Sequence, residues 1–173
     1  KPGDRVGLLA ANRPEWLIAA FAVNKIGATA TAISTFSTPR ELAWTLEHSG
    51  AAALVTISQV RGRLFIDAMR DLCPEIETAV PGALQSPALP DLRTVIAIDS
   101  DSDGAVLSWG DFMARSQTVP ASDLAAVQAR VSHDDWCFIL YTSGSTADPK
   151  GVILRHSHLI ANGFDIGERM HLT

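Results

Sequence analysis

The 173-residue sequence has no apolar run of about 18 residues or more, and it has no cluster of basic residues. The first absence argues against a transmembrane helix, which needs about 20 consecutive apolar residues. The second argues against nonspecific nucleic-acid binding, which needs concentrated positive charge, whereas the net charge is −5. We therefore expect neither a membrane span nor a nucleic-acid partner.

Cysteine is also scarce, and the two cysteines, Cys73 and Cys137, show no C-x-x-C spacing. The sequence therefore indicates neither a zinc site nor a thioredoxin-like redox motif. A reduced pair is typical of the cytoplasm, and Cys137, inside an apolar run, is expected to be a small core residue. The N-terminus has neither an initiator Met nor a signal peptide, so we expect a cytoplasmic chain that belongs to a longer protein.

What is present is a globular composition with 47% apolar residues, enough for one domain with a core. Continuous apolar runs are typical of strands buried on both faces. There are five: Arg5–Ala10, Ala28–Ser34, Ala52–Ile57, Thr94–Ile98 and Trp136–Tyr141. Because helical patterns alternate with them, the predicted fold class is α/β, a mostly parallel sheet flanked by helices. Ligands of such sheets bind at the carboxyl ends of the strands.

Local signals mark where the helices begin and end. Asn12 and Thr38 each lie three residues before a glutamate, with a proline between them, which is typical of a capped helix start. Gly27 and Gly50 suit the left-handed residue that closes such helices. Further helices are expected from Gln59 to Cys73, from Trp109 to Ala114 behind the cap Ser108, and from Ser157 to Leu172. The prolines between residues 74 and 90 predict a long irregular connection.

The segment from Tyr141 to Gly151, YTSGSTADPKG, directly follows the last apolar run. Small residues allow backbone N–H groups to point at a polyanion, hydroxyls add donors, and the lysine adds positive charge. The composition therefore favours a phosphate-binding loop. The candidate residues are Thr142, Ser143, Gly144, Ser145, Thr146, Lys150 and Gly151.

Other readings of this segment fit less well. A Walker A loop would need glycine where Pro149 stands and Ser or Thr where Gly151 stands. The dinucleotide fingerprint G-x-G-x-x-G follows none of the predicted strands. A polar surface loop without a ligand remains the plain alternative on composition alone.

The segment resembles the phosphate loop of the AMP-forming acyl-adenylate ligases, which include acyl-CoA synthetases, peptide-synthetase adenylation domains and luciferase. Only Ala147, where the family usually has glycine, departs from the pattern. Segments on either side are similar to the family as well, whereas residues from about 59 to 131 carry no motif. These similar segments are Gly3–Val6, Asn12–Trp16, Lys25–Ala28, Thr38–Leu42 running to His48–Ser49, Gly151–Val152 and His156–Leu159.

The resemblance implies that a carboxylic acid attacks ATP to give an acyl-adenylate and pyrophosphate, with coenzyme A as a second substrate. It implies that Thr142, Ser143, Ser145 and Thr146 hold the β- and γ-phosphates, and that Lys150 acts catalytically by neutralising the leaving pyrophosphate. Gly144 and Gly151 would let the loop fold tightly and move. Mg²⁺ would share the charge, with no metal ligand assigned to the protein. The segment around Thr38 favours a fatty or aromatic acid.

In the family order, the adenine-binding, ribose-binding and C-terminal lysine segments all lie beyond Thr173. Residues 1–173 are therefore expected to form a single α/β subdomain of a partial AMP-binding N-terminal domain, inactive by itself. Its apolar edges would allow homo-oligomer formation. A peptide-synthetase adenylation module and a noncatalytic nucleotide-binding fragment remain alternatives.

Other polar and aromatic residues have plainer interpretations. His156 and His158 lack the i, i+4 spacing of a metal pair and read as polar residues at a helix start. We interpret His48 and His133 as surface or satisfied polar groups, and Asp134 and Asp135 as a solvated turn. The four tryptophans are expected to fill core or half-buried positions rather than to stack on a base.

The departure from the family pattern at Ala147 can be tested by substitution. A left-handed conformation there would cost alanine about 1–2 kcal/mol, and our hypothesis is that the loop adopts an ordinary conformation instead. Ala147→Gly in the intact enzyme should then change the KM for ATP by less than about tenfold, measured by steady-state kinetics. A larger fall in KM would show that alanine impairs the loop.

Overall fold

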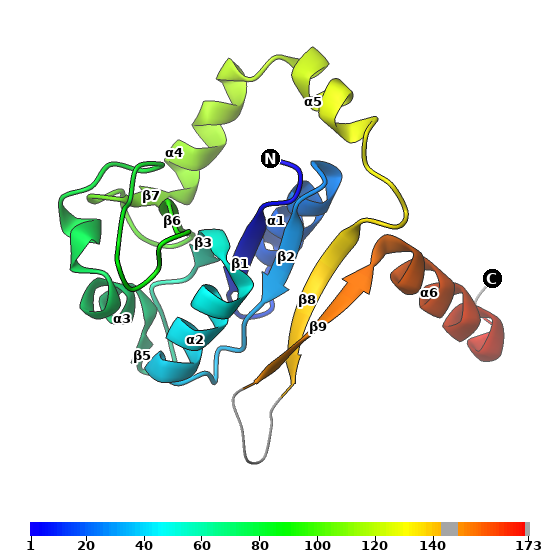
Figure 1. Ribbon diagram of the computed structural model, residues 1–173, viewed down its shortest axis with the longest axis horizontal. Helices are drawn as coiled ribbons and strands as arrows, with labels where there is room; N and C mark the ends of the chain where they lie inside the picture. The colour runs from blue at the N-terminus through cyan, green and yellow to red at the C-terminus, as the bar shows by residue number, and fades with distance from the viewer. Residues whose placement is uncertain (143–148, 172–173) are drawn as a thin grey trace.

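The computed structural model describes residues 1–142 and 149–171. Its centre is a seven-stranded sheet with the order β7-β6-β3-β1-β2-β8-β9 (Figure 1). Neighbouring strands are parallel throughout, except that β9 runs antiparallel to β8. The strands are β1 (Arg5–Leu9), β2 (Thr29–Ala32), β3 (Ala51–Thr56), β6 (Thr94–Ala97), β7 (Val106–Ser108), β8 (Trp136–Thr142) and β9 (Lys150–Arg155). The predicted fold class is confirmed.

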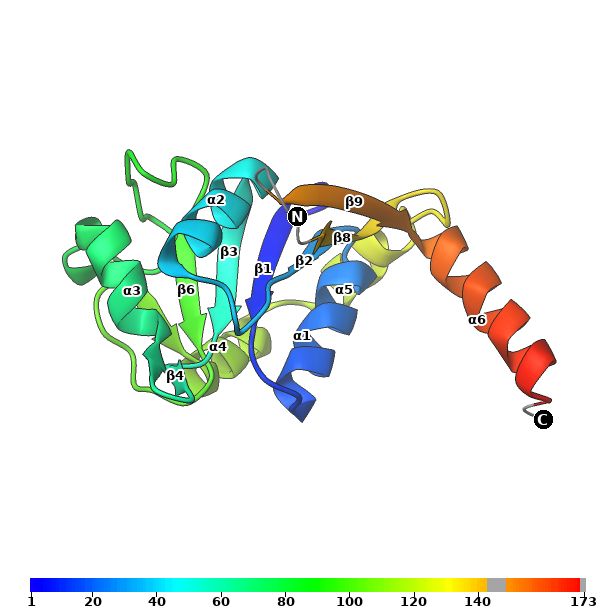
Figure 2. The ribbon, with the colours of Figure 1, turned by 90° about the horizontal axis from the view of Figure 1, so that it is seen from below.

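Helices cover both faces of the sheet (Figure 2). On one face, Leu42 and Leu46 of α2 (Pro39–Ser49) and Met69 of α3 (Phe65–Leu72) pack with Leu54 of the sheet in the larger core cluster. On the other face, α1 (Pro14–Lys25) and α4 (Trp109–Ala114) cover a smaller cluster that includes Leu8, Val55 and Ile96. The central strands are buried from both sides, as their continuous apolar runs predict.

Two strands of the main sheet were not expected from the sequence. β7 has three residues, too few for a periodic signal. β9 follows the polar loop and contains only three consecutive apolar residues, and so short a run does not distinguish a strand from a helix. β8 is also less buried than predicted, since Trp136 is 45% and Leu140 41% exposed. Its run is continuous although many of its side chains lie at the surface.

The helix starts are confirmed in part. Thr38 forms the predicted capping box with Glu41, Ser108 accepts from Asp111 N, and Gly50 closes α2 with φ 60°. The prediction for Asn12 is wrong: Arg13 is the N-cap, and no side chain caps α1. The Arg13 guanidinium instead pairs with Glu15 at 2.8 Å, so this glutamate is not available for a capping box.

The third helix is shorter than predicted. The segment expected to be its first part forms a hairpin of β4 (Gln59–Val60) and β5 (Arg63–Leu64). Arg61 and Gly62, with φ 48° and 78°, form the turn, and a glycine readily adopts such a conformation. α3 therefore begins only at Phe65. The irregular connection after it is confirmed, with one short 3₁₀ turn, η1 (Pro74–Glu77), before β6.

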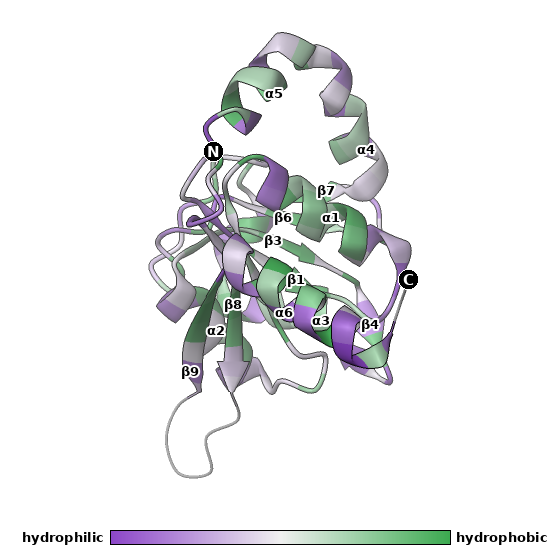
Figure 3. Cartoon of the chain, turned by 90° about the vertical axis from the view of Figure 1, so that its right-hand side faces the viewer, coloured by the Kyte–Doolittle hydropathy of each residue, from purple (hydrophilic) through white to green (hydrophobic). Residues whose placement is uncertain are grey.

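The chain between β7 and β8 leaves the sheet through α4, η2 (Arg115–Thr118) and α5 (Ala121–Gln128), and α6 (His156–Met170) extends away from the body (Figure 1). Neither α5 nor α6 has a buried residue. Figure 3 shows both hydrophobic and hydrophilic residues along α6, and among its apolar side chains Ile160, Phe164 and Met170 are exposed. Within the described ranges, no helix has the length and apolar character needed to cross a membrane.

The capping box makes a testable contribution to stability. The pKa of Glu41 is lowered because its carboxylate accepts hydrogen bonds from the backbone N–H and the hydroxyl of Thr38. Thr38→Ala should lower the free energy of unfolding by about 1 kcal/mol at neutral pH. A lowered pKa stabilises the fold above glutamate's ordinary titration range, so the effect should shrink as the pH falls through the lowered value.

Urea unfolding of the 173-residue chain at several pH values would measure this difference. Thr78→Ala is a matched control, because Thr78 is exposed and its side chain makes no hydrogen bond among the described residues. Equal losses in the two variants would contradict the contribution of the cap.

Candidate functional site

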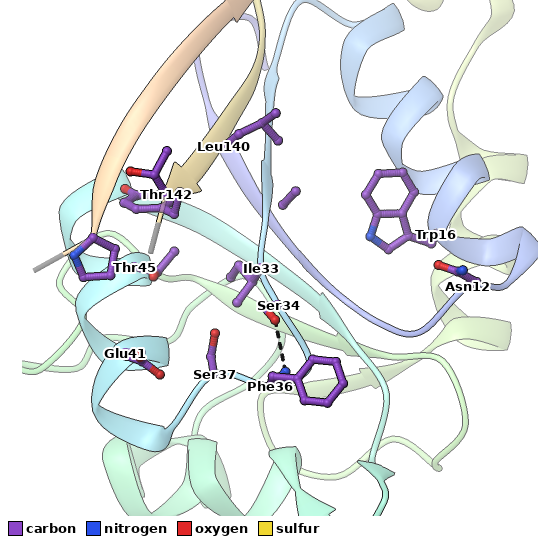
Figure 4. A pocket seen from close by; sticks show the side chains of 13 residues that line it. Asn12, Trp16, Ile33, Ser34, Phe36, Ser37, Glu41, Thr45, Leu140 and Thr142 are labelled. Carbon is purple, nitrogen blue, oxygen red and sulfur yellow. Dashed lines mark hydrogen bonds between the residues drawn. The ribbon is translucent and has the colours of Figure 1, made fainter. Parts of the chain in front are cut away.

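A pocket of about 510 Å³ lies at the carboxyl ends of β2 and β8, where ligands of parallel sheets bind. Polar side chains of Glu41, Thr45 and Thr142 lie on its α2 side, and Trp16 and Asn12 lie on its α1 side (Figure 4). The full lining is Asn12, Trp16, Ala32, Ile33, Ser34, Phe36, Ser37, Glu41, Thr45, Leu140, Tyr141, Thr142 and Pro149. The predicted position of the ligand site at this edge of the sheet agrees with this pocket.

The two ends of the predicted phosphate loop meet at this pocket. Thr142 is the last residue of β8 and Lys150 is the first of β9, and the two are partners in the antiparallel register. Both are exposed. The structure therefore brings one candidate hydroxyl and the candidate cation to the two sides of the loop base. Ser143, Gly144, Ser145 and Thr146 lie outside the described residues.

Gly151, the last of the candidate loop residues, directly follows Lys150. It lies within β9, opposite Tyr141, and not in the loop. A Cβ atom there would be 3.1 Å from Ile139 Cγ2 and 3.4 Å from Tyr141 Cζ. The approach to Ile139 would be tight, whereas the approach to Tyr141 would be an ordinary contact. Glycine thus leaves room for Ile139 and lets the Tyr141 ring lie over it, an arrangement in which an aromatic side chain covers a glycine in the neighbouring strand. The roles predicted for Gly151, in phosphate binding and in the movement of the loop, stay predictions.

Comparison with known proteins identifies the family to which a chain with this site belongs. Residues 1–172 match the family described as AMP-binding enzyme. The chain belongs to the AMP-binding enzyme family. The resemblance inferred from the loop and its flanking segments is thereby confirmed over nearly the whole chain.

Relatives of this AMP-binding chain include proteins named as acyl-CoA ligases. It is 37% identical over 171 residues to YngI of Bacillus subtilis (strain 168), assigned but not established as an acyl-CoA synthetase. It is 34% identical over 170 residues to the mitochondrial medium-chain acyl-CoA ligase ACSF2 of Danio rerio. These matches cover 99% and 98% of the chain but only 31% and 28% of the relatives, so the chain spans about a third of their length.

A solved structure shares the fold. The anthranilate CoA ligase AuaEII, in complex with anthranoyl-AMP, superimposes with a TM-score of 0.69 at 26% identity. The superposition covers 90% of this chain and 26% of that one. The parallel sheet with helices on both faces is thus the arrangement found within a larger ligase of this family.

Two residues near the loop base of this AMP-binding chain were not recognised as candidates for the site from the sequence. Trp44 Nε1 donates a hydrogen bond to the carbonyl oxygen of Pro149 at 3.3 Å, and His48 Nδ1 lies 2.8 Å from the Tyr141 hydroxyl. Burial raises the pKa of that hydroxyl, so Tyr141 is neutral at physiological pH. The i, i+4 spacing of Trp44 and His48 is visible in the sequence, but the sequence does not show which residues they contact.

The remaining sequence interpretations are mostly confirmed. His48 is an exposed, satisfied polar group, His156 and His158 begin α6, and Asp135 accepts from Ser132 N in a turn. Cys137 is buried, and both cysteines are free. Trp136 is an exception, because it is 45% exposed at the surface of β8. Trp16 is half-buried as expected, but it also lines the pocket and stacks on Phe138 at 6.3 Å.

The close packing around Gly151 gives a second prediction. Gly151→Ala should lower the free energy of unfolding by about 1–3 kcal/mol, because the new methyl group overpacks the space between Ile139 and Tyr141. Gly163→Ala is the matched control: it lies in α6 with nothing within 4 Å of its added Cβ, and it should gain about 0.5–1 kcal/mol. Denaturant unfolding of the 173-residue chain measures both, and a neutral Gly151→Ala would refute the packing argument.

Proposed function

We propose that this chain is the phosphate-binding part of an AMP-forming acid–thiol ligase, an acyl-CoA synthetase. The observation that carries the proposal is the convergence of Thr142 and Lys150 on the two sides of one loop, at the carboxyl edge of the parallel sheet of an AMP-binding family member. Residues 1–173 would then form a single α/β subdomain of a larger AMP-binding domain.

The proposed reaction begins with two anions that repel each other. A carboxylate oxygen attacks the α-phosphorus of ATP, and the bond from that phosphorus to the bridging oxygen breaks, so that pyrophosphate leaves with the electron pair. Donors and positive charge around the phosphates lower this barrier, because they stabilise charge where it accumulates on the leaving group. The hydroxyls of Thr142, Ser143, Ser145 and Thr146 would supply donors, Gly144 would permit a tight turn, and Lys150 would supply the charge.

A second step would transfer the acyl group. The thiol sulfur of coenzyme A would attack the acyl carbon and AMP would leave, which gives the thioester. Two of the similar proteins are a medium-chain acyl-CoA ligase and an anthranilate CoA ligase, which supports a fatty or aromatic acid as the substrate class. The apolar side chains of Trp16, Ile33 and Leu140 in the pocket wall are compatible with such acids.

Magnesium is part of the proposal as the partner of the ATP phosphates. The pocket wall contains oxygen donors, Glu41, Thr45 and Thr142, of the kind that this ion accepts. Mg²⁺ retains several waters and takes few ligands from the protein, so the phosphates would supply most of its other ligands.

A cytoplasmic location and a homo-oligomer also remain predictions.

Carboxylate-dependent ATP–pyrophosphate exchange on the intact gene product tests the function. Short, medium, long and aromatic acids should be compared, and exchange with one class would establish adenylation. Lys150→Ala should slow exchange about 10- to 100-fold, because a hydrogen bond to a charged group contributes about 1.5–3 kcal/mol. Lys25→Ala, which removes an exposed lysine at the end of α1, should leave the rate unchanged.

The 173-residue chain alone should release no pyrophosphate. Absence of exchange from the folded wild-type protein with every acid would refute the proposed function, as would equal rates for Lys150→Ala and the Lys25→Ala control.

A further inference from the structure

We propose that Trp44 and His48 of α2 are positioning residues, which hold the two strand ends of the phosphate loop in place for ATP. This inference rests on the proposed function, since it assigns the loop to ATP. It concerns residues outside the loop whose contacts lie entirely within the described part of the chain. Neither side chain lines the pocket, so both would act through the residues that they contact.

The helix that carries them is firmly anchored. Leu42 and Leu46 on its inner face are each 2% exposed in the larger core cluster. The capping box fixes its first turn, and Gly50 closes it in the left-handed conformation. Trp44 and His48 are four residues apart, so they share one side of the helix, and their rings lie 5.1 Å apart. Both side chains are therefore held by a helix that is fixed in position.

One contact fixes the strand that leaves the loop. Trp44 Nε1 donates to the carbonyl oxygen of Pro149 at 3.3 Å, a partly buried hydrogen bond between residues 105 positions apart. Pro149 directly precedes Lys150 in the chain. Restraining the Pro149 carbonyl therefore restrains the backbone from which the Lys150 side chain extends.

The other contact fixes the strand that enters the loop. His48 Nδ1 lies 2.8 Å from the Tyr141 hydroxyl, and the two rings meet edge to face with centroids 5.7 Å apart. The Tyr141 ring also lies close to Gly151 of β9. Since Tyr141 directly precedes Thr142, this contact restrains the backbone of the candidate hydroxyl residue in the same way.

The two contacts act in the same way on the two strand ends of the loop. Each one holds the residue before a candidate phosphate ligand, and both come from one helix. Holding donors in place before the ligand arrives reduces the ordering cost of binding. Core packing does not account for the pair, because His48 is exposed and Trp44 only half-buried. Positioning of the loop ends explains the contacts better than burial does.

The test compares conservative variants of the intact protein. Trp44→Phe keeps a ring but loses the Nε1 donor, Tyr141→Phe loses only the hydroxyl, and His48→Gln removes the imidazole. Each should raise the dissociation constant for ATP, measured by equilibrium titration, and the KM for ATP in exchange by about 3- to 10-fold. The KM for the acid and the melting temperature should stay at their wild-type values.

The double variant His48→Gln/Tyr141→Phe sharpens the test, because the two side chains contact each other. It should be no weaker in ATP binding than the worse single variant, because either change alone already removes the contact between the two side chains. Trp109→Phe in α4 and His133→Gln, an exposed histidine before β8, are matched controls and should leave ATP binding unchanged.

Three results would overturn the inference: unchanged ATP affinity in all three variants, equal losses for ATP and acid with a lowered melting temperature, or losses in the controls of the same size. The proposed function fails separately, if the wild-type protein shows no exchange with any acid. ATP affinity measured by titration still decides the positioning role in that case.

Discussion

The parallel pairing of β2 with β8 is the interaction on which the arrangement of the site depends. It joins residues more than a hundred positions apart, with Ala30, Thr31 and Ala32 opposite Phe138, Ile139 and Leu140. The Thr29 hydroxyl adds a hydrogen bond to the Trp136 carbonyl at 3.3 Å. Through this pairing the β8–β9 hairpin reaches α2, and the loop opens onto the pocket at the ends of β2 and β8. A shift of two residues in register would move Tyr141 about 7 Å along the strand and away from His48.

Local signals made much of the fold predictable from sequence. The capping box at Thr38 and the left-handed glycine at position 50 act within a few residues, so the sequence contains all that they need. The same type of signal failed at Asn12, where Arg13 pairs with Glu15 and removes the glutamate from the cap. The helix expected from Gln59 was wrong in its first part, where the turn at Gly62 gives a hairpin instead.

The candidate site was predictable only in part. The loop segment identifies itself by composition, and the comparisons confirm the family that it indicates. The long-range contacts of the loop ends could not be predicted, because Trp44 and His48 contact residues that are 105 and 93 positions away. A sequence shows that the two side chains share a helix face, but only the sheet pairing decides what that face meets. The strand β9 was missed for another reason, because its three consecutive apolar residues are too short a run to distinguish a strand from a helix.

The two edges of the sheet are built very differently. β7 ends one side with only three residues, and a short edge strand offers little to a partner. β9 ends the other side with six, and within the described residues no strand pairs with its outer edge. Val152 and Ile153 on it are 44% and 40% exposed, so free backbone groups and apolar side chains lie together. Such an edge can pair with a strand of another copy of the chain, so the solubility of the protein depends on how β9 is covered.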